Sequence, residues 1–157
     1  MKINLIVVGK TNEKFLISGE AEYAKRINRY VKFAKIEIPD LKNAKKMSRD
    51  EIKREEGKLI LSKLSPNGLI VLLDDKGTAK TSLQFAKWIQ NTMNRGHKHI
   101  TFIVGGAYGF SDDVYKTANE QLSLSKMTFS HQMIRLFFTE QIYRGFAILN
   151  NEPYHHE

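Results

Sequence analysis

An apolar run leads directly into a glycine-rich turn at Ile100-Thr101-Phe102-Ile103-Val104-Gly105-Gly106-Ala107-Tyr108-Gly109. The apolar part is typical of a buried strand, and the glycines allow backbone to approach a ligand closely. A second stretch, residues 122–135, reads LSLSKMTFSHQMIR and continues into a final helix expected from about Ser130 to about Asn150. We therefore expect the residues that form a site to lie in the last third of the chain.

Outward from this stretch, strand-like and helix-like segments alternate along the chain. Apolar runs predict strands at residues 3–8, 34–38, 69–73, 100–104 and, more briefly, 122–124. Helices are expected after Asn12, Ser48, Thr81 and Ser111, and the second and third of these open with capping boxes. This alternation predicts a single α/β domain over residues 1–157, with a parallel sheet covered by helices on both faces. Ligands of such sheets bind beyond the carboxyl ends of the strands, where Gly9, Gly77 and the 105–109 cluster lie.

The charge of the chain points to a polyanionic partner. It has 25 basic and 17 acidic residues, a net charge of +8, and residues 1–78 hold 17 of the basic and 11 of the acidic ones. Nucleic acid is a more natural partner for this balance than a membrane, although the charge also fits a merely soluble basic protein. No cysteine is present, which excludes disulfides and thiolate metal sites. No apolar stretch approaches the ~18 residues of a membrane span, and we expect a cytoplasmic protein.

Several motifs of known chemistry are absent. Gly9-Lys10-Thr11 follows a strand, but the first glycine of a phosphate-binding P-loop is missing, and no GxGxxG follows the first strand. His97 and His99 have no accompanying acidic or histidine cluster, so no metal site is predicted. No Ser–His–Asp order or paired carboxylates stand out. A nucleotide-dependent hydrolase is therefore disfavoured.

The last helix carries two patterns that sequence alone leaves open. His131, Arg135 and Thr139 form one polar stripe, for which the spacing by itself favours a solvent-exposed face. The apolar residues of this helix exceed one buried stripe, so the helix is either buried centrally or packs partly against a second subunit. The terminal His155-His156 pair is expected to be a loose tail.

Taken together, these motifs resemble the SPOUT class of knotted methyltransferases, and within it the ribosomal RNA large-subunit methyltransferase H family. The likeness covers nearly the whole chain. It rests on Val-Gly-Lys after the first strand, Glu56-Gly57, Leu73 to Gly77, Gly-Gly-x-x-Gly, Leu-Ser-x-Ser with Phe129-Ser130-His131, Glu140-x-x-Tyr143-Arg144, and Pro153-Tyr154-His155. The resemblance implies a C-terminal trefoil knot, a homodimer whose site is completed across the interface, and transfer of methyl from S-adenosylmethionine to N3 of a pseudouridine in large-subunit ribosomal RNA.

The same resemblance assigns site residues by position. The cofactor would contact Leu73, Gly105 and the segment Leu124, Ser125, Lys126, Met127, Thr128 and Phe129, with Gly106 and Gly109 shaping the loop. His131, Arg135, Tyr154 and His155 would face the RNA base. His156 stands where relatives often carry Arg or Lys, and a mostly neutral histidine would weaken a phosphate contact there.

The sequence leaves open how His131 and Arg135 divide the work of the reaction. The acceptor N3 must lose a proton as it attacks the methyl group, and His131 is a candidate to accept it. Arg135 could instead stabilise the anionic base. A basic segment is expected to contact ribosomal phosphates; its members are Lys42, Lys45, Lys46, Arg49, Lys53, Arg54 and Lys58. The alternative function is a non-catalytic RNA-binding or ribosome-associated factor, which would bind RNA but no S-adenosylmethionine.

Overall fold

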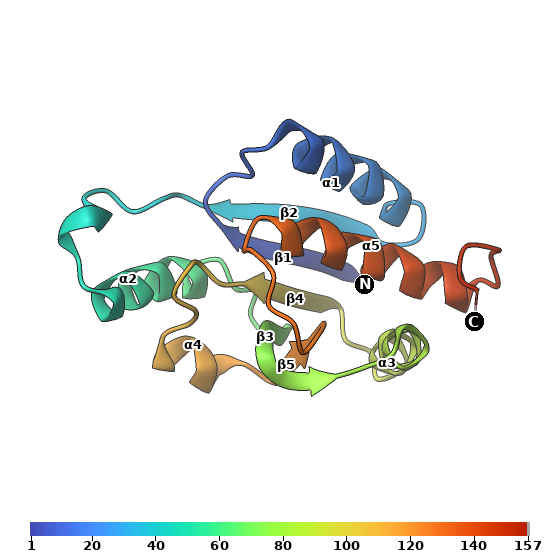
Figure 1. The fold of residues 1–157 in the computed structure, drawn as a ribbon. Coiled ribbons are helices and arrows are strands. Elements are labelled where there is room, and N and C mark those ends of the chain that lie inside the picture. The colour runs from blue at the N-terminus through green and yellow to red at the C-terminus, as the bar shows by residue number, and fades with distance from the viewer. Residues whose placement is uncertain (157) are drawn as a thin grey trace.

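The computed structural model of the chain describes residues 1–156 as a three-layer α/β structure (Figure 1). Its strands are β1 (Lys2–Val8), β2 (Lys32–Ile38), β3 (Leu69–Ala79), β4 (His99–Val104) and β5 (Glu120–Ser123). Its α-helices are α1 (Lys14–Ile27), α2 (Arg49–Leu61), α3 (Ser82–Asn94), α4 (Asp112–Thr117) and α5 (Met133–Leu149), and a 3-10 turn covers Ala44–Lys46.

The five strands form one parallel sheet in the order β2-β1-β4-β3-β5. Crossovers through α1 and α3 run in one direction along the sheet and share one face, while those through α2 and α4 run in the other direction on the opposite face. A single handedness of the β–α–β crossover requires this division of the helices between the faces. The predicted parallel sheet with helices on both faces is confirmed.

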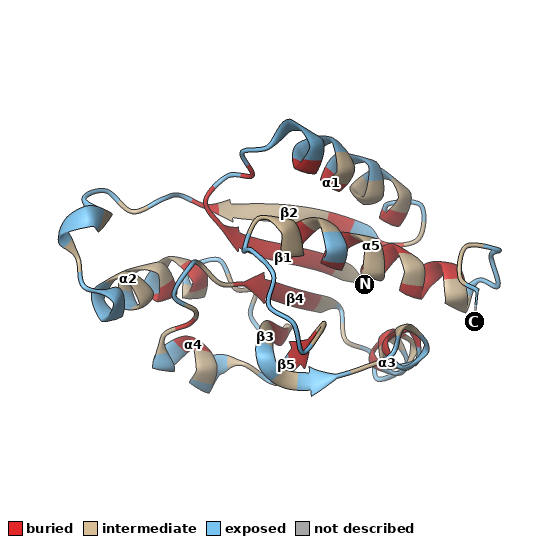
Figure 2. Ribbon diagram, viewed as in Figure 1, coloured by how far each residue is buried: buried red, intermediate tan, exposed pale blue. Residues whose placement is uncertain are grey.

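Each face of the sheet has its own apolar core (Figure 2). Alternate β1 residues serve the two sides, with Leu5 buried under α1, α3 and α5 and Ile6 buried under α2 and α4. Helix α5 lies between α1 and α3, where Phe138 and Ile142 are fully buried. The apolar surplus of this helix is thus largely used within one chain, and Phe137 is the residue left 43% exposed.

Local signals set most element boundaries. Thr81 and Gln84 form the complete predicted capping box of α3, and Ser48 accepts a hydrogen bond from the Glu51 amide at the start of α2. Strand β3 differs from the expectation, since it continues to Ala79 after a shift of its register against β5 between Leu73 and Thr78. The four residues in this shift are polar or glycine, which hides the second half of the strand from an apolar pattern.

Candidate active site

A cleft of about 520 Å³ lies beyond the carboxyl ends of β3, β4 and β5. Three chain segments line it: the register shift of β3, the glycine-rich loop between β4 and α4, and the loop between β5 and α5. Nearly all predicted cofactor residues line this cleft, namely Leu73, Gly105, Gly106, Gly109, Leu124, Ser125, Met127, Thr128 and Phe129. Lys126 is exposed and is not among the lining residues.

The glycine-rich loop is a tight turn closed on itself. The Gly109 amide donates to the Gly106 carbonyl at 3.2 Å, and the two glycines form an antiparallel bridge. Gly109 has φ +85°, in the left-handed region that favours glycine. A side chain at Gly105 would lie 3.2 Å from the Phe110 ring. The turn therefore keeps its backbone bare and close to the cleft.

The loop after β5 is held by its own serines. Ser123 donates to the Ser125 carbonyl at 2.9 Å, and the Ser125 hydroxyl accepts from the Met127 amide at 2.9 Å. Ser130 accepts from the Met133 amide at 3.0 Å, which fixes the entry into α5. These contacts are local in sequence, so the Ser-x-Ser spacing itself shapes this wall of the cleft. Met127 projects from it with 77% of its surface exposed.

The sequence did not predict a role for Asp74, a cleft residue whose carboxylate accepts two hydrogen bonds. The Tyr115 hydroxyl of α4 donates to Asp74, whose other oxygen accepts from the Lys76 amide at 2.9 Å. Burial raises the pKa of Asp74, but these hydrogen bonds outweigh it, and the pKa lies below its ordinary value. Burial and the bond to Asp74 raise the pKa of Tyr115. The cleft therefore presents a stable negative charge.

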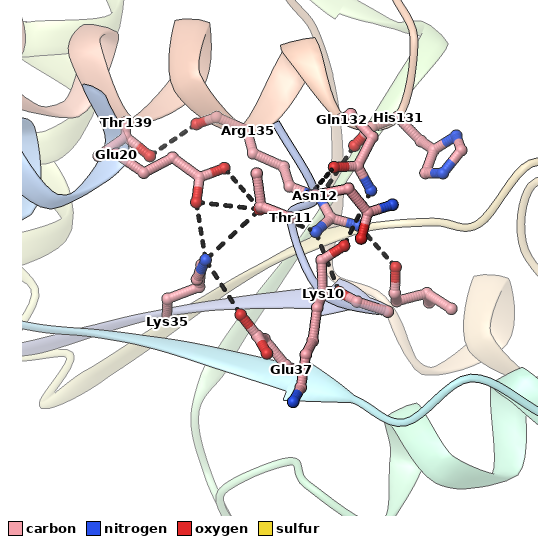
Figure 3. Close-up of polar contacts among 12 residues, drawn as sticks. Lys10, Thr11, Asn12, Glu20, Lys35, Glu37, His131, Gln132, Arg135 and Thr139 are labelled. Carbon is pink, nitrogen blue, oxygen red and sulfur yellow. Dashed lines mark hydrogen bonds and ion pairs between the residues drawn. The ribbon is translucent and has the colours of Figure 1, made fainter. Parts of the chain in front are cut away.

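His131 and Arg135 are separated by the structure although they lie one turn apart (Figure 3). His131 is exposed and lines the cleft. Arg135 is fully buried, and its guanidinium donates to the carbonyls of Val8 at 2.6 Å and Gly9 at 3.0 Å. It also donates to the Thr11 hydroxyl at 3.1 Å, and its Nε donates to the His131 carbonyl at 2.9 Å.

The solvent-exposed stripe that helical spacing favoured is therefore wrong for two of its three members. Thr139 is 2% exposed and donates to the Arg135 carbonyl, and Arg135 faces the β1–α1 loop. Behind Arg135, Thr11 donates to Glu20 at 3.0 Å, and Lys35 pairs with Glu20 at 2.7 Å. Arg135 joins the entry of α5 to the end of β1 and has no surface from which to reach a base.

The C-terminal residues form a second polar cluster against the middle and second half of α5. Tyr154 donates to Glu140 at 2.9 Å, and its hydroxyl lies 3.1 Å from that of Tyr23. Arg144 pairs with Glu140 at 2.5 Å and lies 3.3 Å from Nδ1 of His155. The expectation of a loose tail is wrong for His155, which Arg144 of α5 contacts. Tyr154 is likewise fixed against α1 and α5.

Sequence reasoning assigned Arg144 and Glu140 no place in a site. Their i, i+4 spacing indicated only a helix salt bridge, although both stand in the motif that also holds Tyr143. The guanidinium of Arg144 also lies 4.8 Å from the Tyr154 ring centroid. Tyr154 and His155 are therefore held by a cationic group of α5.

The two predicted halves of the site lie at different points along α5. The cleft is lined by residues at the start of the helix as far as Ile134, whereas the tail contacts Glu140 and Arg144. These two residues stand six and ten positions beyond Ile134, which is roughly 9 and 15 Å along the axis at 1.5 Å per residue. Among the described residues, no group of three or more His, Asp or Glu side chains is arranged to hold a metal ion. Within residues 1–156, every helix is too short or too polar to cross a bilayer.

Comparison with known proteins identifies the family to which the chain belongs. The family described as "Predicted SPOUT methyltransferase" matches residues 1–155. The chain belongs to the SPOUT methyltransferase family. It is 54% identical to the Ribosomal RNA large subunit methyltransferase H of Parabacteroides distasonis and 52% identical to that of Flavobacterium psychrophilum, in both cases over 157 residues and all of each chain.

The fold of this SPOUT methyltransferase family member is similar to that of a solved structure. The structure of "a probable methylase family protein" from Haemophilus influenzae Rd KW20 matches it with a TM-score of 0.52, at 12% identity, over 99% of this chain and 70% of that chain. At this identity the match bears on the fold alone. The family resemblance and the methyltransferase class predicted from the sequence are confirmed.

Proposed function

We propose that this SPOUT methyltransferase family member transfers the methyl group of S-adenosylmethionine to N3 of a pseudouridine in large-subunit ribosomal RNA. The observation that carries the proposal is the cleft formed jointly by the glycine-rich loop and the loop after β5, in a chain about half identical to two ribosomal RNA large subunit methyltransferases. Its volume of about 520 Å³ lies within the usual range of small-molecule sites.

The residues around the cleft suit a sulfonium donor. When bound, S-adenosylmethionine supplies a methyl group activated by a positively charged sulfur. Asp74 stays ionised in the cleft wall, which favours a cationic ligand. Leu73, Leu124 and Phe129 offer apolar surface, and the bare backbone at Gly105 and Gly106 offers hydrogen-bonding groups to an adenine.

The chain's own residues would hold and deprotonate the acceptor. His131 lines the cleft, which supports it as the group that would accept the proton from N3. Arg135 donates to the His131 carbonyl, so it fixes the position of His131 from beneath. Tyr154, His155 and Arg144 would contact the RNA base, by stacking or at its edge.

A homodimer would bring these groups together. Arg144, which contacts His155, stands ten residues beyond the cleft residue Ile134, roughly 15 Å along α5, so we expect the tail of a second copy to complete each cleft. Exposed apolar side chains at the cleft and next to it offer a suitable surface: the ring centroids of Phe129 and Phe137 lie 5.2 Å apart, and Met127 is 77% exposed.

A trefoil knot forms part of the same proposal. From β5 at the sheet edge, the chain returns to β1, where Gln132 binds Lys10 and Asn12 and Arg135 binds Val8. Such a return across β3 and β4 is the path that a knotted C-terminal segment would take. Stretching the denatured chain from its two ends would test it, because a knot shortens the fully extended length.

The central experiment uses the protein with labelled S-adenosylmethionine and large ribosomal subunits that lack the modification. We expect label in a pseudouridine nucleoside carrying one methyl group, identified by mass. Free large-subunit RNA serves in parallel, since the assembled particle is the expected substrate. Calorimetry with the donor alone is the second measurement, and absence of donor binding would contradict the proposal.

A further inference from the structure

Tyr108 stands at the tip of the glycine-rich turn and is the most exposed aromatic residue of the cleft wall, with 44% of its surface accessible. The bridge between Gly106 and Gly109 holds the turn on both sides of this tip. A rigid turn that presents an exposed tyrosine at the mouth of a cleft fixes the ring before any ligand arrives.

Arg49, from another part of the chain, lies over this ring. It is the first residue of α2, and its guanidinium carbon lies 5.1 Å from the ring centroid of Tyr108. Its side chain is exposed, and among residues 1–156 no carboxylate comes within ion-pair distance of it. The contact therefore leaves a positive charge and an aromatic ring open to solvent.

The surroundings of this pair are basic. Lys42, Lys45 and Lys46 precede α2 and are all exposed. The acids of the same turn are Asp50 and Glu51, of which Asp50 lies 3.4 Å from Lys53. The Arg49–Tyr108 contact thus connects the basic segment to the edge of the cleft.

We propose that Tyr108 and Arg49 form a stacking platform for an unpaired nucleobase that neighbours the target nucleotide in the RNA, while the adjacent lysines contact its phosphates. The inference rests on the proposed function, because it takes RNA to be the substrate. Aromatic rings and guanidinium planes are the groups on which proteins stack the splayed bases of single-stranded RNA. A target base inside the cleft places its neighbour at the mouth, where this pair lies.

The test compares native protein with Tyr108→Leu and Tyr108→Phe, using large ribosomal subunits that lack the modification. Dissociation constants for the subunits are measured without donor, KM for the subunits with donor, and the donor dissociation constant by calorimetry. We expect Tyr108→Leu to weaken subunit binding and raise KM by about tenfold, the effect of losing one base stack. Tyr108→Phe keeps the ring and should stay within about twofold, with donor affinity unchanged in both.

Arg49 is tested through salt dependence. Arg49→Gln should reduce the slope of log affinity against log salt by about one contact, whereas Tyr108→Leu should leave the slope unchanged. Lys87→Gln, at an exposed position on α3, is the matched charge control and should leave binding and slope as in the native protein. Thermal unfolding of each variant verifies that it folds.

Three results would overturn the platform. Equal subunit affinity of Tyr108→Leu and native protein would remove the stack. An equal loss in Tyr108→Phe would show a hydroxyl contact instead. Weaker donor binding in Tyr108→Leu at unchanged subunit affinity would place the ring on the donor. Each of these outcomes is compatible with a native protein that methylates the subunits, so failure of the platform is distinct from failure of the proposed function.

Discussion

Replacing Arg135 with alanine tests whether this residue organises the site or reacts within it. The guanidinium is fully buried and donates four hydrogen bonds, to the carbonyls of Val8, Gly9 and His131 and to the Thr11 hydroxyl. Arg135→Ala removes all four donors at once. It also removes the positive charge that lies nearest Thr11, leaving Lys35 as the direct partner of Glu20.

The structure sets the size of the effect. Hydrogen bonds that involve a charged group contribute about 1.5–3 kcal/mol each, but water can enter the space that the side chain leaves and recover part of this. Removing one partner from a buried charged network costs about 3–5 kcal/mol, and we expect that loss in the free energy of unfolding. For a domain of this size it corresponds to a fall in Tm of roughly 10 °C. Arg135→Lys keeps the charge but not the forked geometry, and it should lose about half as much.

Urea unfolding at low temperature, followed by circular dichroism, measures the loss. Arg29→Ala is the matched control, because that arginine is exposed, and it should change stability by less than about 0.5 kcal/mol. A stability loss below about 1 kcal/mol in Arg135→Ala would refute the reasoning. So would Arg135→Lys with native stability and native binding of donor and RNA but no turnover, since that pattern belongs to a group that acts on the reacting base.

Three further predictions concern other parts of the site. A Cβ at Gly77 would lie 2.6–2.8 Å from backbone atoms of β5, so Gly77→Ala should separate β3 from β5 and weaken donor binding measured by calorimetry. Gly68→Ala is the control, because its Cβ would have its nearest contact at 3.4 Å, and it should bind the donor normally. Burial and the charge of Asp40 raise the pKa of Glu56 above its ordinary 4.5. The free energy of unfolding of the native protein, relative to that of Glu56→Gln, should therefore fall as pH rises from 4.5 through the raised pKa. A difference between the two proteins that does not change with pH in urea titrations would contradict this. Phe137→Glu should convert a dimer to a monomer in sedimentation equilibrium at micromolar concentration, and a native protein that is already monomeric would exclude the dimer.

The sequence predicted those parts of the fold that depend on neighbouring residues. The capping box at Thr81 and the apolar runs of β1 and β4 are local patterns, and the structure confirms them. The end of β3 was missed because Asp74 to Gly77 interrupt the apolar run, while pairing with β5, about 45 residues later, continues the strand.

In the candidate site, too, local geometry could be predicted and long-range contacts could not. The glycine turn and the Ser-x-Ser loop could be located because their geometry is made within each segment. The burial of Arg135 could not be predicted, since three of its four acceptors lie 124 to 127 positions away. Helical spacing indicates which residues share a face, but not which element packs against that face.

The place of α5 between α1 and α3 has a consequence for synthesis of the protein. Phe138 and Ile142 close the core over β1, yet they are made about 130 residues after that strand. A nascent chain that ends before residue 133 leaves one side of its sheet uncovered and open to aggregation. The sheet therefore completes its core only after α5 has been translated, and termination before that helix yields a fragment suited to chaperones or proteases.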